Sequence, residues 1–333
     1  RPARTVWTAG TVAHANVAPL VDRTFADGDA LVAALRALHA LHDASDDCAL
    51  DAAALSRSWE EAVRTHQGGD RGAARAAYAR MLALQPGFAP AHYLCGLVVR
   101  DEGDGAAARA EFAAALSAAP LYIDARLAAA RAATDAHEPE AAAALCGEGL
   151  ERAPAHVALW RTLGLAQLQR RDGDAAATAF ERALALEPDD GETHYNHGVA
   201  LQMQGRLSDA ARAYQRALAF RPDMVAADFN LGVLFQEQGA TDAAIKAYQS
   251  VLKANPQYAN AYKNLGEVLL GSGRIDAWLA NFERFGVNCP RALPLAVQAL
   301  EACQYLGDFA RLERYLEGLR REDGWVDMQV KFL

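Results

Sequence analysis

The stretch that decides the fold is residues 157–190, VALWRTLGLAQLQRRDGDAAATAFERALALEPDD. Its proline, Pro188, belongs to a series in which each proline follows the last by 34 residues. The series consists of Pro86, Pro120, Pro154, Pro188, Pro222, Pro256 and Pro290. Proline donates no backbone hydrogen bond and disfavours helical conformation in the residue before it, so it suits the end of a helix. A fixed proline interval therefore predicts a repeat array in which each unit ends its second helix at the same place.

Numbering each unit so that its proline is position 32 brings other positions into register. Position 8 is small: Ala62, Gly96, Ala130, Gly164, Gly198, Gly232 and Gly266. Position 20 is alanine in six units: Ala74, Ala108, Ala142, Ala176, Ala210 and Ala244. Position 24 carries a ring: Tyr78, Phe112, Phe180, Tyr214, Tyr248 and Phe282. Small residues where two helices cross let their backbones approach closely, and a ring fills the space between one unit and the next.

These positions resemble the tetratricopeptide (TPR) repeat, whose pattern is W-x2-L-G-x2-Y, then A-x3-F, then P. Residues 157–190 match it at Trp160, Leu163, Gly164, Ala176 and Phe180, and depart from it at the tyrosine position, which is Gln167. The resemblance implies an all-α fold, a right-handed α-solenoid superhelix of about seven to eight helix–turn–helix repeats. Seven of these are expected over residues 55–292.

Two repeats deviate from the pattern. The third has Cys146 at the ring position and Gly149 at position 27, so we expect the weakest contact between neighbouring repeats there. The seventh has Trp278 at the small position 20, so its two helices are expected to open or shift to fit the indole.

The ends of the chain do not carry the regular repeat. Residues 1–54 are expected to cap the array or to be the remnant of a preceding domain, with an amphipathic helix over 29–44. Residues 293–320 fit a degenerate eighth repeat or C-terminal cap. Residues 321–333 are expected to form an extended tail, since apolar and polar residues alternate from Val326 to Phe332, which is typical of a strand.

Asparagine recurs at position 6 of three consecutive repeats, as Asn196, Asn230 and Asn264. In a TPR superhelix this position lies on the concave face, and an amide both donates and accepts hydrogen bonds, so the series could hold the backbone of an extended peptide. Beside it stand Tyr195, Phe229, Lys263, Gln202 and Gln236. The alternatives are that the asparagines make local helix–helix hydrogen bonds and that the aromatic residues are ordinary packing residues. Lys263 with Asn264 only partly matches a pocket for a terminal carboxylate.

Other classes of function find little support. The formal net charge of −9 argues against a general nucleic-acid or anionic-membrane binder. The five scattered cysteines form no CxxC pair, and no hydrophobic run is long enough to span a bilayer. His194 and His197 are better explained by packing than by metal binding, and His39 and His42 likewise. We therefore expect no cofactor, no metal, no catalytic constellation and a cytoplasmic location.

The stretch from Ala277 to Cys303 resembles the end of the TPR region in bacterial SPINDLY-type, O-GlcNAc-transferase-like proteins. That resemblance implies that the array presents protein substrates to a glycosyltransferase domain, with Asn196, Asn230 and Asn264 contacting the substrate backbone. Few residues follow Arg321, so we expect the catalytic domain to lie outside this chain, in cis or in trans, and whether the chain belongs to an enzyme stays open. The first residue is Arg rather than Met, which suggests a processed chain or a fragment.

Three functions therefore compete. The chain is first a protein- or peptide-binding scaffold, alternatively the substrate arm of a SPINDLY-like transferase, and alternatively a structural subunit. In the last case residues 324–333 would drive homo-oligomerisation.

Overall fold

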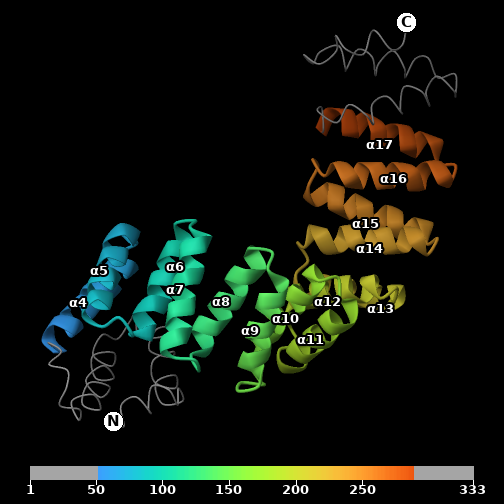
Figure 1. Ribbon diagram of the computed structural model, residues 1–333. Coiled ribbons are helices and arrows are strands. Elements are labelled where there is room, and N and C mark those ends of the chain that lie inside the picture. Colours follow the sequence, from blue (N-terminus) through green and yellow to red (C-terminus); the bar gives the residue numbers. More distant parts are fainter. Residues whose placement is uncertain (1–51, 289–333) are drawn as a thin grey trace, which may run out of the picture. The chain divides into compact units, whose positions relative to one another are not determined.

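The computed structural model describes residues 52–288, which contain helices and no strand (Figure 1). The chain divides into two compact units, residues 1–188 and 189–333, which are described separately. The helices of the first unit are α4 (Ala52–Gln67), α5 (Arg71–Leu84), α6 (Ala89–Asp101), α7 (Gly105–Ala118), α8 (Ile123–Asp135), α9 (Pro139–Leu150), α10 (Val157–Gln169) and α11 (Gly173–Leu186). Those of the second unit are α12 (Gly191–Met203), α13 (Leu207–Phe220), α14 (Val225–Glu237), α15 (Thr241–Ala254), α16 (Ala259–Gly271) and α17 (Ile275–Asn288).

Each predicted repeat corresponds to one pair of consecutive helices, which confirms the all-α solenoid. The predicted end segments 1–54 and 293–333 lie outside the described residues, apart from the start of α4. The division into cap, degenerate repeat and tail therefore stays a prediction.

The two helices of a repeat are joined by a turn at position 15, where the backbone adopts positive φ. Gly239 has φ of 70°, whereas the third and fourth repeats place His137 and Arg171 there, with φ of 58° and 59°. Glycine adopts this conformation without steric cost, so the other repeats use it. In three repeats of the first unit the next residue is an aspartate that caps the second helix: Asp70, Asp104 and Asp172 accept hydrogen bonds from the backbone amides of Ala73, Ala107 and Ala175.

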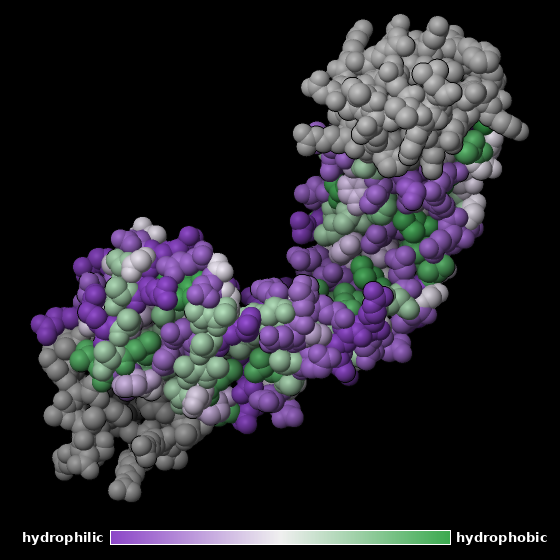
Figure 2. Space-filling model, turned by 45° about the horizontal axis from the view of Figure 1, so that its top comes forward, coloured by the Kyte–Doolittle hydropathy of each residue, from purple (hydrophilic) through white to green (hydrophobic). Residues whose placement is uncertain are grey.

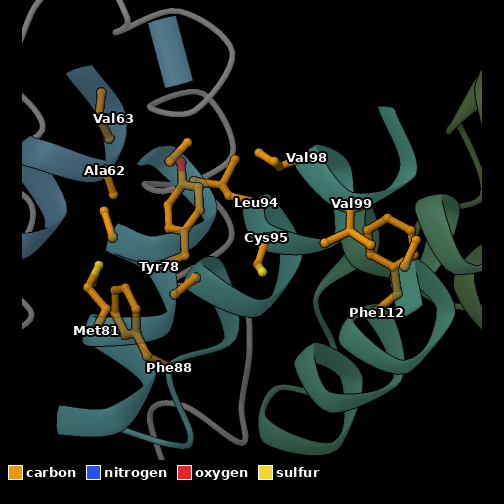
Figure 3. Close-up of a cluster of buried hydrophobic side chains, with 14 of the residues drawn as sticks. Ala62, Val63, Tyr78, Met81, Phe88, Leu94, Cys95, Val98, Val99 and Phe112 are labelled. Atoms are coloured by element: carbon orange, nitrogen blue, oxygen red, sulfur yellow. The ribbon is translucent and has the colours of Figure 1, made fainter. Parts of the chain in front are cut away.

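The glycines at position 8 make room for the ring at position 24 of the same repeat. A Cβ atom added at Gly96 would lie 2.5 Å from the ring of Phe112, and one added at Gly232 would lie 2.7 Å from the ring of Tyr248. Figure 3 shows Tyr78 and Phe112 among the buried side chains of the first repeats, with Cys95 and Val99 of α6 nearby. The small residue and the ring therefore form one packing unit.

The prolines that define the period are also held by hydrogen bonds. The residue at position 4 of the following repeat lies within hydrogen-bonding distance of the proline carbonyl: His92 Nε2 is 2.9 Å from that of Pro86, and Trp160 Nε1 donates to that of Pro154 at 2.8 Å. In the third repeat Arg126 donates to the carbonyl of Pro120 at 2.6 Å. Glu111 hydrogen-bonds His92 and raises the pKa of its imidazole. The period thus marks a polar contact between repeats as well as the end of a helix.

The expectation of a weak contact after the third repeat is wrong. Cys146 is fully buried with Leu159 of the next repeat, and a Cβ atom on Gly149 would lie 2.7 Å from Leu159 Cδ1. The guanidinium of Arg126 is also buried and pairs with Glu148. Because positions 24 and 27 of the third repeat carry small residues, the larger side chains of Leu159 and Arg126 fill the space beside them.

The expectation for the seventh repeat is confirmed. Trp278 is buried between α16 and α17, and a Cβ atom on Gly266 would lie 3.5 Å from the nearest atoms, Trp278 Nε1 and Asn281 Nδ2. This is an ordinary van der Waals distance, whereas a Cβ atom at the equivalent Gly232 would overlap a ring, so the helix pair of the seventh repeat has opened or shifted to fit the indole.

This difference predicts opposite effects for one substitution at two equivalent positions. Gly232→Ala is expected to destabilise the chain by about 1–3 kcal/mol, because the methyl group overlaps the buried ring of Tyr248. Gly266→Ala meets no such overlap and is expected to be neutral or to stabilise by up to about 1 kcal/mol, since alanine favours helix over glycine. Urea unfolding of the two variants checks this, and an equal loss of stability in both would contradict the packing described.

Candidate peptide-binding surface

The predicted site residues lie in the second unit, on the first helix of each of its repeats. Asn196, Asn230 and Asn264 are half-buried, one each on α12, α14 and α16. The flanking residues Tyr195, Phe229, Gln202 and Gln236 are half-buried as well, whereas Lys263 is exposed. Each side chain recurs at the repeat interval on the same kind of helix.

Two of the three asparagines belong to a hydrogen-bonded chain that links neighbouring repeats. The hydroxyl of Tyr214 donates to Gln202 Oε1 at 2.9 Å and accepts from Asn230 Nδ2 at 3.3 Å. The next repeat reproduces the pattern: Tyr248 donates to Gln236 Oε1 at 2.8 Å and accepts from Asn264 Nδ2 at 3.3 Å. We call each set of three residues, Gln202–Tyr214–Asn230 and Gln236–Tyr248–Asn264, an amide relay.

The tyrosines of the relays keep their protons. Burial raises the pKa of Tyr248 to about 12 and shifts the pKa of Tyr214 in the same direction. A protonated phenol has one hydrogen to donate, which goes to the glutamine, and an oxygen that accepts from the asparagine. The tyrosine hydroxyl therefore requires the two amides of a relay to have opposite orientations, one accepting from it and the other donating to it.

Asn196 differs from the other two asparagines. The ring position of the preceding repeat is Phe180, which has no hydroxyl, so a relay cannot form. Asn230 also has a second contact, because its Nδ2 lies 3.4 Å from the hydroxyl of Tyr195. The three asparagines share a position but not an environment.

The aromatic residues at position 5 take part in packing. The ring of Tyr195 lies 5.7 Å from that of Tyr214, and Phe229 lies 5.8 Å from Tyr248 and 5.1 Å from Tyr258. Similar ring clusters occur in the first two repeats, where Trp59 and Tyr93 occupy position 5. Tyr195 and Phe229 thus pack within the array, and each keeps part of its surface exposed.

Charges on this surface are mostly acidic. Glu192, Glu237 and Glu267 are exposed on α12, α14 and α16, and Lys263 lies 4.0 Å from Glu267. An exposed pair of this kind contributes little to stability. Lys263 faces a carboxylate of its own helix, which disfavours a role in binding a terminal carboxylate.

The sequence contained a signal for the relays that the sequence analysis missed. Where position 24 is tyrosine, position 12 of the same repeat is a polar residue that can accept a hydrogen bond from the tyrosine hydroxyl: His66, Gln202 or Gln236. In the first repeat Tyr78 lies 3.0 Å from His66 Nδ1. Where position 24 is phenylalanine, position 12 is Arg100, Leu168 or Leu270.

Other candidate chemistry is weaker. Within residues 52–288 no group of three histidine, cysteine or acidic residues could hold a metal ion. His194 is buried and stacks on Phe220 at 5.6 Å, whereas His39 and His42 lie outside the described residues. Burial raises the pKa of the Cys95 and Cys146 thiols to about 12, which makes them poor nucleophiles. Of the helices in the described part, none has the length and hydrophobicity to cross a membrane.

The face of the chain drawn in Figure 2 is mainly hydrophilic, with hydrophobic residues in separate patches. Three large hydrophobic side chains among the described residues of the second unit, Met203, Phe220 and Leu270, are 42%, 44% and 48% exposed and stand on three different helices. Polar groups that recur at the repeat interval are therefore the more distinctive feature of this surface.

Comparison with solved structures finds the same architecture in several proteins. A tetratricopeptide repeat protein from Parabacteroides merdae is 17% identical with a TM-score of 0.56, covering 74% of this chain and 98% of that one. PilF from Pseudomonas aeruginosa is 16% identical with a TM-score of 0.54, covering 64% and 96%. YrrB, described as a TPR protein with an unusual peptide-binding site, is 17% identical with a TM-score of 0.49, covering 56% and 95%. At these identities the likeness to the Parabacteroides merdae protein and to PilF shows the fold alone.

Comparison with curated proteins gives no match. The family model for the tetratricopeptide repeat matches residues 67–123, 127–192, 161–227, 195–256 and 229–277, which together span more than half of the chain. This match agrees with the helix pairs and with the spacing of the prolines. The chain therefore belongs to the tetratricopeptide repeat family.

Proposed function

We propose that the chain is a protein-binding scaffold and that its fifth to seventh repeats hold an extended peptide by its backbone. The observation that carries the proposal is the amide relay. In each relay the tyrosine hydroxyl makes a hydrogen bond with one polar atom of each amide, Nδ2 of the asparagine and Oε1 of the glutamine. The second polar atom of each amide, Oδ1 of the asparagine or Nε2 of the glutamine, has no hydrogen-bond partner in the described part of the chain. These atoms are not fully buried.

The free ends have the chemistry that a peptide bond needs. Asn Oδ1 accepts a hydrogen bond from a backbone N–H, and Gln Nε2 donates one to a backbone carbonyl. Since backbone groups are the same in every sequence, such contacts tolerate many peptide sequences. The half-buried rings of Tyr195 and Phe229 offer apolar surface for side chains, and the exposed carboxylate of Glu237 favours a basic residue in the peptide.

The test starts with selection of binding peptides from a displayed library of random dodecamers, followed by fluorescence anisotropy with the best one. We expect Asn230→Ala combined with Asn264→Ala to weaken binding at least about tenfold, since each lost hydrogen bond contributes about 1 kcal/mol. Gln215→Ala combined with Gln249→Ala removes two exposed amides of α13 and α15 and serves as the matched control.

A second arm leaves the protein unchanged, so that misfolding cannot explain the result. Methylation of single backbone nitrogens in the peptide removes one donor at a time. We expect at least one such methylation to reduce affinity as much as the loss of an asparagine does. Failure to enrich any peptide, or equal affinity for the asparagine variants and the control, would contradict the proposed function.

A narrower version of the function is that this array presents substrates to a SPINDLY-like glycosyltransferase domain. Its support is the recurrence of asparagine at position 6 and the sequence from Ala277 onwards, most of which lies outside the described residues. If the transferase domain belonged to the same polypeptide, the coding sequence before or after residues 1–333 would encode a sugar-nucleotide-binding domain, so reading that sequence tests this version. Assembly through residues 324–333, also outside the described part, would instead show as a change of mass in solution when they are deleted.

A further inference from the structure

We propose that Tyr214 and Tyr248 are positioning residues that hold the two amides of each relay in opposite orientations, so that each relay offers one free donor and one free acceptor to a peptide backbone. This inference rests on the proposed peptide-binding function and adds residues that do not themselves touch the peptide. Both tyrosines are fully buried, so their hydroxyls act through the asparagine and glutamine.

The geometry of the relays is directional. In both, the hydroxyl donates toward the first helix of its own repeat and accepts from the first helix of the next. The free donor therefore belongs to the earlier helix and the free acceptor to the later one. Helix α14 contributes to both relays, since it carries Asn230 of one and Gln236 of the other.

This arrangement matters because a peptide backbone offers acceptors and donors in alternation. A bound chain whose carbonyl meets the glutamine and whose N–H meets the asparagine satisfies both free groups of a relay. If one amide of the relay turned over, its free group would meet a group of the same kind, and unsatisfied polar groups are costly at a partly buried surface. Without the Tyr248 hydroxyl, Gln236 and Asn264 can each turn over, and the match to the backbone is lost.

The chain itself indicates that the hydroxyl is not needed for packing. Phenylalanine occupies the same position as Phe112, Phe180 and Phe282, and these rings are buried like the two tyrosines. Tyr214→Phe and Tyr248→Phe are therefore expected to fold. Tyr258→Phe is the control, because the ring of Tyr258 packs on Phe229 and its hydroxyl is outside both relays.

The experiment is a double-mutant cycle between the single tyrosine variants and the N-methylated dodecamers of the preceding section. We expect Tyr248→Phe to weaken the unmodified peptide about fivefold to tenfold, the scale of one hydrogen bond. The methylation that faces the second relay should then cause little further loss, while the methylation that faces the first relay keeps its full effect. Tyr214→Phe should show the reverse pattern with a smaller loss, because Asn230 keeps its contact with the Tyr195 hydroxyl, and Tyr258→Phe should show neither effect.

Additive losses in every cycle would overturn the inference, because a merely structural role of the tyrosines lowers affinity without coupling to one peptide position. That result is distinct from failure of the proposed function, in which the asparagine variants themselves keep full affinity. Circular dichroism of each variant shows whether it is folded. Tyr258→Phe shows whether loss of a hydroxyl outside the relays changes binding.

Discussion

Phe112→Ala is expected to lower the free energy of unfolding by about 3–5 kcal/mol, the range for removing a fully buried aromatic ring. The ring of Phe112 fills the position next to Gly96 and lies 6.2 Å from the ring of Tyr93. It belongs to a cluster that continues to Ala128 in the next repeat, so its loss weakens the contact within a repeat and between two repeats.

Urea unfolding of the full chain measures the effect, with Leu84→Ala as the control. Leu84 is 45% exposed in the same unit, and its truncation is expected to change stability by about 0.5 kcal/mol or less. Equal losses in both variants would show that the position-24 rings do not hold the array together.

Cys146→Phe is expected to destabilise the chain by about 3 kcal/mol, at the upper end of the usual cost of overpacking. Restoring the ring that most other repeats carry would be expected to stabilise the array if each repeat packed alike. In this structure the space is already filled, since Cys146 has no exposed surface and packs with Leu150 and Leu159.

The same measurement decides between the two expectations. Cys146→Ala serves as the control, because it removes only the sulfur and is expected to cost about 1 kcal/mol. A Cys146→Phe variant more stable than the natural chain would contradict the packing at the third repeat.

Much of the fold could be predicted from the sequence because TPR packing depends on a few positions that leave a clear pattern. Glycine at 164, 198 and 232 and proline at 188, 222 and 256 report local requirements, namely close contact with a ring and the end of a helix. The third repeat could not be predicted in this way. Its packing depends on Arg126 and Leu159, which enter from positions that the pattern does not constrain.

The candidate surface was predictable in position but not in chemistry. The recurrence of Asn196, Asn230 and Asn264 is visible in the sequence, and so are the two interpretations of it. The structure shows that Asn230 and Asn264 do make hydrogen bonds between helices, and that this leaves one end of each amide available. The two interpretations are therefore compatible, which spacing alone could not show.

Nuclear magnetic resonance of the side-chain amides tests the central claim most directly. The selected dodecamer is titrated into the full chain while the NH2 resonances of asparagine and glutamine are followed. Saturable shifts are expected at Asn230, Asn264, Gln202 and Gln236. No shift is expected at Asn281, which is buried and donates to the backbone carbonyl of Tyr262 at 2.9 Å. Binding of the peptide with these four resonances unmoved would contradict the central claim.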